Sequence, residues 1–236
     1  MLSFLLALAP AALAADMHDL SPTHELPEGT VAYTAGALVR LRADFAADAP
    51  VVRRLAAGTR VRVVEQVGDR VEVTVGGARG FIARELLSTM GRTVDLDGDG
   101  VEERVVVALD AQGRSVAWLR EGAQVQQLLL FPYADPYLGD WDLVPADTAG
   151  VPLLRVGLGQ DACGAFPTSW LSFQDGTFRE ALGVVEIGDG GYSTTYDVRF
   201  DAPGQVSIHA EEREDGDILS ASDRVCALTG GVYSCG

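Results

Sequence analysis

The residues most able to do chemistry lie in the segment DLDGDGVEE, Asp95–Glu103. Three aspartates alternate along it (Asp95, Asp97 and Asp99), and the glycines between them allow a tight backbone turn. Calcium takes roughly six to eight oxygen ligands, and a tight loop with carboxylates at every second position supplies them. The segment therefore predicts a cation site. The alternative is an Asp-Gly-rich surface turn that binds nothing, because these residues also favour turns by themselves.

This segment runs directly into the apolar stretch Arg104–Leu109. Together the two resemble the calcium loops of integrin-type FG-GAP repeats, in which D-x-D-G-D-G-x-x-D/E leads into an apolar strand. The resemblance implies a calcium ion with a structural role. Its ligands would be the side chains of Asp95, Asp97, Asp99 and Glu103 and the carbonyl oxygen of Val101. An EF-hand shares the opening of the motif but requires a Glu at the twelfth loop position, where this chain has Val106.

The N-terminal residues 1–14, MLSFLLALAPAALA, form an apolar run that ends in small residues. This pattern is typical of a secretory signal peptide, with cleavage expected after Ala14, although no basic residue precedes the run. The alternative is a short membrane anchor or a buried N-terminal helix, but spanning a bilayer takes about 20 residues. We therefore expect an exported protein, periplasmic or extracellular, with no transmembrane segment in the mature chain.

Charge is distributed unevenly along the chain. From Arg40 to Arg92 there are 10 arginines and 6 acidic residues, a local balance of +4. From Thr93 to the end 8 arginines face 24 acidic residues, a balance of −16. The strongly negative total argues against nucleic-acid binding, which depends on basic groups that neutralise phosphates. The change of sign near residue 92 predicts a domain boundary.

Short runs of alternating apolar and polar residues follow one another between Val31 and Leu87. Leu38–Leu41, Arg60–Val63 and Val71–Val75 have a period of two and are bounded by Gly or Asp, so we expect half-buried strands. Residues 15–29 contain two prolines and no such pattern, and we expect them to be irregular.

The stretch from Val39 to Leu87 resembles a bacterial SH3 (SH3b-type) domain. The matching positions are Val39, Leu41 and Arg42, then Val52, Leu55, Gly58, Val61 and Val63, and finally Gly77, Gly80, Phe81, Ile82 and Leu86. The resemblance implies a small SH3-like barrel over residues 30–90 that binds a cell-wall or envelope protein ligand. Arg70 and Phe81 stand where the family commonly has tryptophans, so a role as a packing spacer stays open.

The region from Thr93 to Gly236 also reads as β-rich. Expected strands are Glu103–Leu109, Ser115–Leu119, Gln126–Phe131, Leu153–Leu158, Ser169–Phe173, Asp197–Phe200 and Gln205–His209. Their short spacing predicts a sandwich or a propeller-like partial sheet over residues 91–236. A complete propeller would need several similar blades, and only one calcium-type loop is present. The fold class expected for the whole chain is all-β.

The three cysteines leave their pairing open. Cys226 and Cys235 flank a Thr-Gly-Gly turn and could form a disulfide across a hairpin, which leaves Cys163 unpaired.

A peptidase is the alternative function. The segment DACGAF, Asp161–Phe166, resembles the D-C-S-G pattern of NlpC-type cell-wall cysteine peptidases, with Cys163 as nucleophile and His209 as base. Ala162 interrupts the pattern, and Pro167 disfavours the helix that should begin at the nucleophile. We therefore expect a non-enzymatic binding or scaffolding protein of the cell envelope with a structural calcium site.

Overall fold

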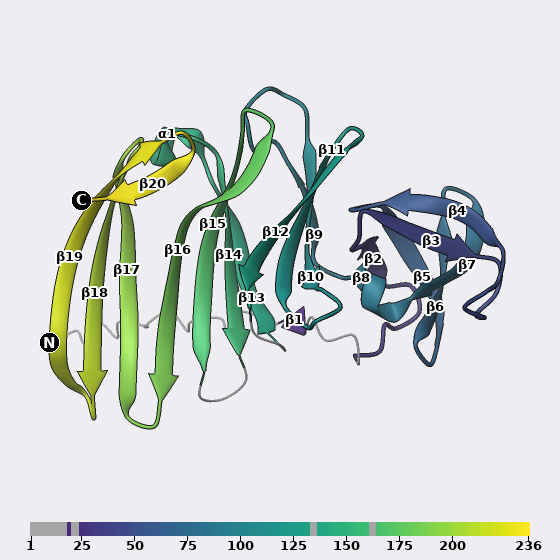
Figure 1. The fold of residues 1–236 in the computed structure, drawn as a ribbon, viewed down its shortest axis with the longest axis horizontal. Coiled ribbons are helices and arrows are strands. Elements are labelled where there is room, and N and C mark those ends of the chain that lie inside the picture. Colours follow the sequence, from purple (N-terminus) through teal and green to yellow (C-terminus); the bar gives the residue numbers. More distant parts are fainter. Residues whose placement is uncertain (1–17, 20–23, 133–135, 161–163) are drawn as a thin grey trace, which may run out of the picture.

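The computed structural model describes residues 18–19, 24–132, 136–160 and 164–236. Within them the chain is almost entirely β, in three antiparallel sheets (Figure 1). In this described part of the chain the helical elements are one short α-helix, α1 (Ala146–Ala149), and one 3-10 helix, η1 (Arg84–Leu86). The all-β prediction is confirmed.

The N-terminal sheet has seven strands that form a small separate unit (Figure 1). In spatial order they are β4 (Val51–Ala56), β3 (Leu38–Arg42), β7 (Ala78–Ala83), β6 (Arg70–Val75), β5 (Arg60–Val67), β2 (Val31–Thr34) and β8 (Leu87–Ser88). The three predicted strands of this region are present. Their alternate apolar residues, such as Val39 and Leu41 or Val71 and Val73, point inward and form the core of the unit.

A second, four-stranded sheet follows in the chain. Its spatial order is β12 (Gln124–Phe131), β11 (Ser115–Glu121), β10 (Glu103–Leu109) and β9 (Gly91–Val94). The sequence of β10 has a continuous apolar run because both of its faces are covered. Val105 and Val107 pack toward the nine-stranded sheet described next, whereas Val106 and Ala108 pack toward Ala35 of the N-terminal unit.

The third sheet has nine strands. Their order is β1 (His18–Asp19), β13 (Pro136–Val144), β14 (Leu153–Gln160), β15 (Ala165–Gln174), β16 (Thr177–Asp189), β17 (Tyr192–Ala202), β18 (Gln205–Glu214), β19 (Asp217–Thr229) and β20 (Val232–Cys235). From β13 onward each strand pairs with the next one in the chain. The segment 15–29, expected to be irregular, contributes β1, which pairs with β13 through His18–Leu138 and Asp19–Tyr137.

The four-stranded sheet packs against strands β14, β15 and β16 of the nine-stranded sheet, and the two share a hydrophobic core. Strands β17–β20 contribute to a separate core. In the shared core, Leu96, Val105 and Leu119 come from the first sheet and its loop, and Leu154, Leu171 and Phe173 come from the second. All six side chains are buried. Of the two expected arrangements, this packing corresponds to the sandwich.

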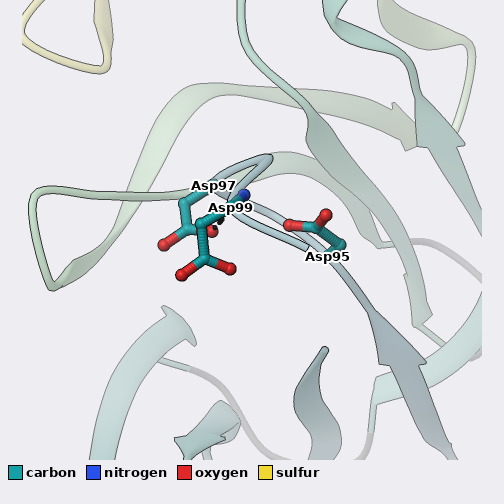
Figure 2. Close-up of side chains that lie close together, drawn as sticks. All are labelled: Asp95, Asp97 and Asp99. Carbon is teal, nitrogen blue, oxygen red and sulfur yellow. Dashed lines mark hydrogen bonds between the residues drawn. The ribbon is translucent and has the colours of Figure 1, made fainter. Parts of the chain in front are cut away.

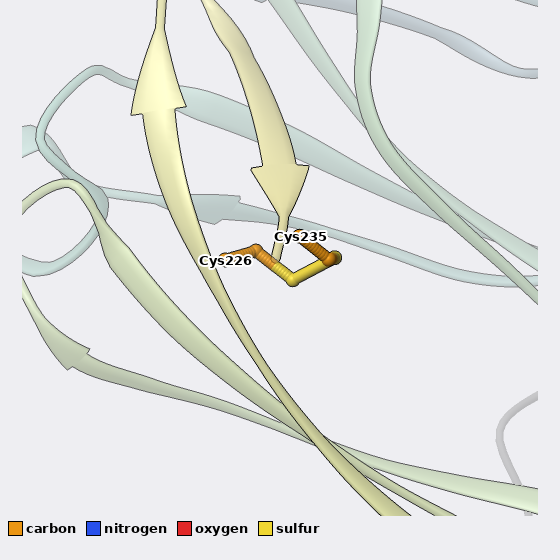
Figure 3. The surroundings of a disulfide bond; sticks show 2 residues. All are labelled: Cys226 and Cys235. Atoms are coloured by element: carbon orange, nitrogen blue, oxygen red, sulfur yellow. A yellow bond between two sulfur atoms is a disulfide. The ribbon is translucent and has the colours of Figure 1, made fainter.

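The C-terminal hairpin carries a disulfide. Cys226 of β19 and Cys235 of β20 lie directly opposite each other in register and are bonded (Figure 3). The Tyr233 hydroxyl donates a hydrogen bond to the carbonyl of Ala149, and Ser172 Oγ donates one to the carbonyl of Gly231 at 3.0 Å. The sequence left the pairing open, and the structure pairs Cys226 with Cys235; Cys163 lies outside the described residues.

The N-terminal unit and the four-stranded sheet are joined by close contacts. Ser88 Oγ donates to the carbonyl of Val107 at 2.6 Å, and the N–H of Val107 donates to the carbonyl of Met90 at 3.0 Å. Gly91 lies against the ring of Tyr33, so closely that an added Cβ would overlap the ring. The position at which β9 leaves the N-terminal unit therefore requires a residue without a side chain.

We expect Gly91→Ala to lower the free energy of unfolding by about 1–3 kcal/mol, because the ring of Tyr33 and the strand must move apart. Urea denaturation measures this loss. Gly188→Ala is the matched control, because a Cβ there would meet Phe166 only at an ordinary 4.0 Å. Equal losses in the two variants would contradict the close packing at Gly91.

Candidate cation site

The loop that connects β9 to β10 folds around the carboxylates of its own aspartates. Asp95 accepts hydrogen bonds from the N–H groups of Gly98 (Oδ1, 2.7 Å) and Gly100 (Oδ2, 3.1 Å). Both glycines have positive φ, 80° and 88°, which lets the backbone curl back over Asp95. Two further turns are closed by side chains: Asp99 N–H donates to Asp97 Oδ1 (3.1 Å), and Val101 N–H donates to Asp99 Oδ1 (2.6 Å).

Leu96 anchors this loop to the core. Its side chain is fully buried in the core shared by the two sheets. Its N–H donates to Glu103 Oε2 at 2.6 Å, and its carbonyl accepts a hydrogen bond from Gln174 Nε2 of β15 at 3.1 Å. Because Leu96 stands between Asp95 and Asp97, these contacts fix the backbone from which both carboxylates project.

The three loop aspartates come together at the surface. One carboxylate oxygen from each of Asp95, Asp97 and Asp99 lies within 4.8 Å of the other two (Figure 2). Asp95 and Asp97 are partly buried, and Asp99 is exposed. Burial raises the pKa of Asp97, and the negative charges of Asp99 and Asp95 raise it further. Close carboxylates of this kind are favourable ligands for a hard cation.

A second group of carboxylates lies on the inner side of Asp97. Oxygens of Asp97, Glu103 and Glu121 are within 4.8 Å of one another. Glu103 is completely buried, and its Oε1 has no hydrogen-bond partner among the described residues. Burial raises the pKa of Glu103 to about 7, and the charges of Asp97, Asp95 and Glu121 add to the effect. A buried carboxylate oxygen without a partner is costly, and a cation beside it would offset that cost.

The structure thus places the predicted ligands in two overlapping groups. Asp95, Asp97 and Asp99 meet directly, whereas Glu103 meets Asp97 but belongs to the inner group. Val101, whose carbonyl was the fifth expected ligand, is an exposed residue of the loop. Its backbone N–H donates a hydrogen bond to Asp99 Oδ1.

Glu121 is the acidic residue that sequence reasoning missed. It lies 18 positions after Glu103, at the end of β11, beyond the strand expected from the apolar pattern. The β10–β11 register pairs Arg104 with Arg120, and Glu103 and Glu121 are the next residues outward on the two strands. Only the register, not the local motif, brings the two together.

The two residues of the alternative peptidase interpretation can be placed only in part. His209 lies on β18, with Nδ1 2.8 Å from Asp223 Oδ1 and Nε2 3.2 Å from Glu211 Oε1. These hydrogen bonds, that with Asp223 first, raise the pKa of His209. Cys163 lies outside the described residues. The segment after it forms β15, in agreement with the strand expected around Ser169–Phe173.

The two positions where SH3b domains commonly have tryptophan lie on neighbouring strands. Arg70 begins β6 and pairs with Ala83, and Phe81 of β7 pairs with Glu72. Phe81 is partly buried, and Arg70 lies 3.9 Å from the carboxylate of Asp69.

Among the described residues no helix is both long and apolar enough to cross a membrane. No protein-family model, curated protein or solved structure matches this chain.

Proposed function

We propose that this protein is an exported, non-enzymatic binding or scaffolding protein of the cell envelope, and that a structural calcium ion stabilises its C-terminal β region. The ion would be held at the start of that region, where the chain leaves the N-terminal unit through β9. The seven-stranded N-terminal unit would supply the surface for a cell-wall or envelope protein ligand, as the SH3b resemblance implies.

The observation that carries the cation site is the environment of the Glu103 carboxylate. Its carboxylate is fully buried, and one of its two oxygens has no hydrogen-bond partner among the described residues. Two other carboxylates lie within 4.8 Å of it, so the local charge is strongly negative. Removing one charge from water without a partner costs several kcal/mol, and a divalent cation bound beside it would offset that cost.

The donor set fits calcium. The side chains of Asp95, Asp97, Asp99 and Glu103 offer only oxygen atoms, which are the ligands of hard cations. Their backbone is held in place by Leu96 and Gln174, so the loop is partly organised before an ion arrives. A bound calcium ion would neutralise charge and connect the loop to β10.

Two features support the proposed location outside the cytoplasm. The N-terminal run that ends at Ala14 has the pattern of a secretory leader. The disulfide between Cys226 and Cys235 belongs to a type of bond that persists mainly in oxidising compartments. Extracellular modules commonly bind calcium weakly, because the ion is abundant there.

The proposal is tested by melting the protein in calcium and in chelator. Calcium at about 100 times its Kd adds about 2.7 kcal/mol of stability, which raises the Tm of a chain of this size by roughly 5–10 °C. Asp97→Ala together with Asp99→Ala should abolish the shift. The control pair, Asp189→Ala with Asp201→Ala, removes the same charge from exposed positions elsewhere and should keep it. Identical wild-type curves in calcium and in chelator would refute the calcium site.

A further inference from the structure

Glu121 occupies a position that the loop motif does not define. It is the last residue of β11, one position beyond Arg120, which pairs with Arg104 of β10; Glu103 is one position before Arg104. One of its carboxylate oxygens lies within 4.8 Å of oxygens of both Glu103 and Asp97. Three segments therefore converge at this point: the loop through Asp97, the start of β10 and the end of β11.

With both side chains charged, this arrangement is unfavourable unless a cation is present. Like charges directly opposite each other on neighbouring strands destabilise a sheet. Here one member of the pair, Glu103, is fully buried, and neither it nor Glu121 has an ion pair within the described residues. Arg104 and Arg120 are the adjacent residues along each strand, so their side chains project from the opposite face.

We propose that Glu121 is a further ligand of the same cation, on the side of Asp97 and Glu103. This inference rests on the proposed function, because it concerns the same ion. The ligands of the loop motif alone would connect the β9–β10 loop to β10. With Glu121 as a ligand, the ion also links the loop to β11. The buried, unpartnered oxygen of Glu103 is the independent observation that points to a ligand at this position.

Calorimetric titration of calcium into the full chain tests this assignment. Glu121→Gln keeps the size and shape of the side chain but removes its charge, and we expect it to weaken calcium binding at least about tenfold. Glu102→Gln is the matched control. Glu102 is an exposed residue beside Glu103 and belongs to neither carboxylate group. The calcium affinity of Glu102→Gln should therefore stay within about twofold of that of wild type.

A second measurement separates a ligand from a residue that only packs. In metal-depleted protein Glu121→Gln removes the repulsion with Glu103, so its Tm should equal or exceed that of wild type. In saturating calcium its Tm should fall below that of wild type. A residue with only a packing role would lower the Tm in both conditions.

The two proposals fail in distinguishable ways. If wild type binds calcium and Glu121→Gln binds it equally well, or if the Tm falls in both conditions, Glu121 is not a ligand and the loop site stands. If wild type does not bind calcium at all, the proposed calcium site fails, and the role of Glu121 fails with it.

Discussion

Between about pH 4.5 and pH 7 the metal-depleted protein is expected to lose about 3 kcal/mol of unfolding free energy through Glu103 alone. Burial raises the pKa of this carboxyl group from 4.5 to about 7 in the folded state. Within that window the folded protein holds a proton that the unfolded chain releases. Stability is therefore fully present below about pH 4.5 and is lost as the pH rises through about 7.

The variant Glu103→Gln isolates this contribution. Glutamine resembles the protonated side chain and does not titrate, so the variant should show a flatter dependence of unfolding free energy on pH. Urea denaturation of both proteins at several pH values from 4.5 to 8, after metal depletion, gives the difference directly. The other carboxyl groups are common to the two proteins, so the difference reports the titration of Glu103 together with its coupling to Asp97, Asp95 and Glu121. Parallel pH profiles would show that Glu103 is not the group responsible.

In metal-depleted protein at neutral pH, Glu103→Gln should be more stable than wild type. In saturating calcium, wild type should be the more stable of the two. The ion binds the charged form of Glu103, so it offsets the cost that burial places on that charge. The variant cannot supply the same charge and should gain less from calcium. The carboxylate that destabilises the metal-depleted protein is thus the one from which a bound ion derives its stabilising effect.

Much of the fold could be predicted because local patterns and tertiary packing agree. The strand Glu103–Leu109 was predicted with its observed bounds, because a β-branched run after an Asp-Gly turn has few alternatives. The strand β19 is an instructive omission. Its residues from Asp217 to Val225 are exposed and lack an alternating apolar pattern, so pairing with β18 determines their conformation.

The candidate site also has one part that the local sequence predicts and another that depends on tertiary packing. The aspartates of the loop are close in sequence, and their grouping follows from local turns alone. The burial of Glu103 and the position of Glu121 depend on how two sheets pack and on a hairpin register. The contact between Gln174 and Leu96 crosses 78 positions, and no local signal could indicate it.

Phe173→Ala is expected to cost about 3–5 kcal/mol of unfolding free energy. The side chain is 1% exposed and lies on β15, in the core shared by the four-stranded and nine-stranded sheets. Neighbouring strands on both sides hold the backbone of β15, so the two sheets can close the resulting cavity only in part. The loss should be near the upper end of the range for this kind of change.

The matched control is Phe166→Ala, on the same strand. Phe166 is 37% exposed and lies outside this core, so the same truncation should cost only about 1 kcal/mol. Urea denaturation in saturating calcium measures both variants with the cation site in one state. A loss at Phe173 no larger than that at Phe166 would mean that the two sheets do not share a close-packed core. The buried environment of Glu103, which lies at the edge of that core beside Leu96, would then lose its physical basis.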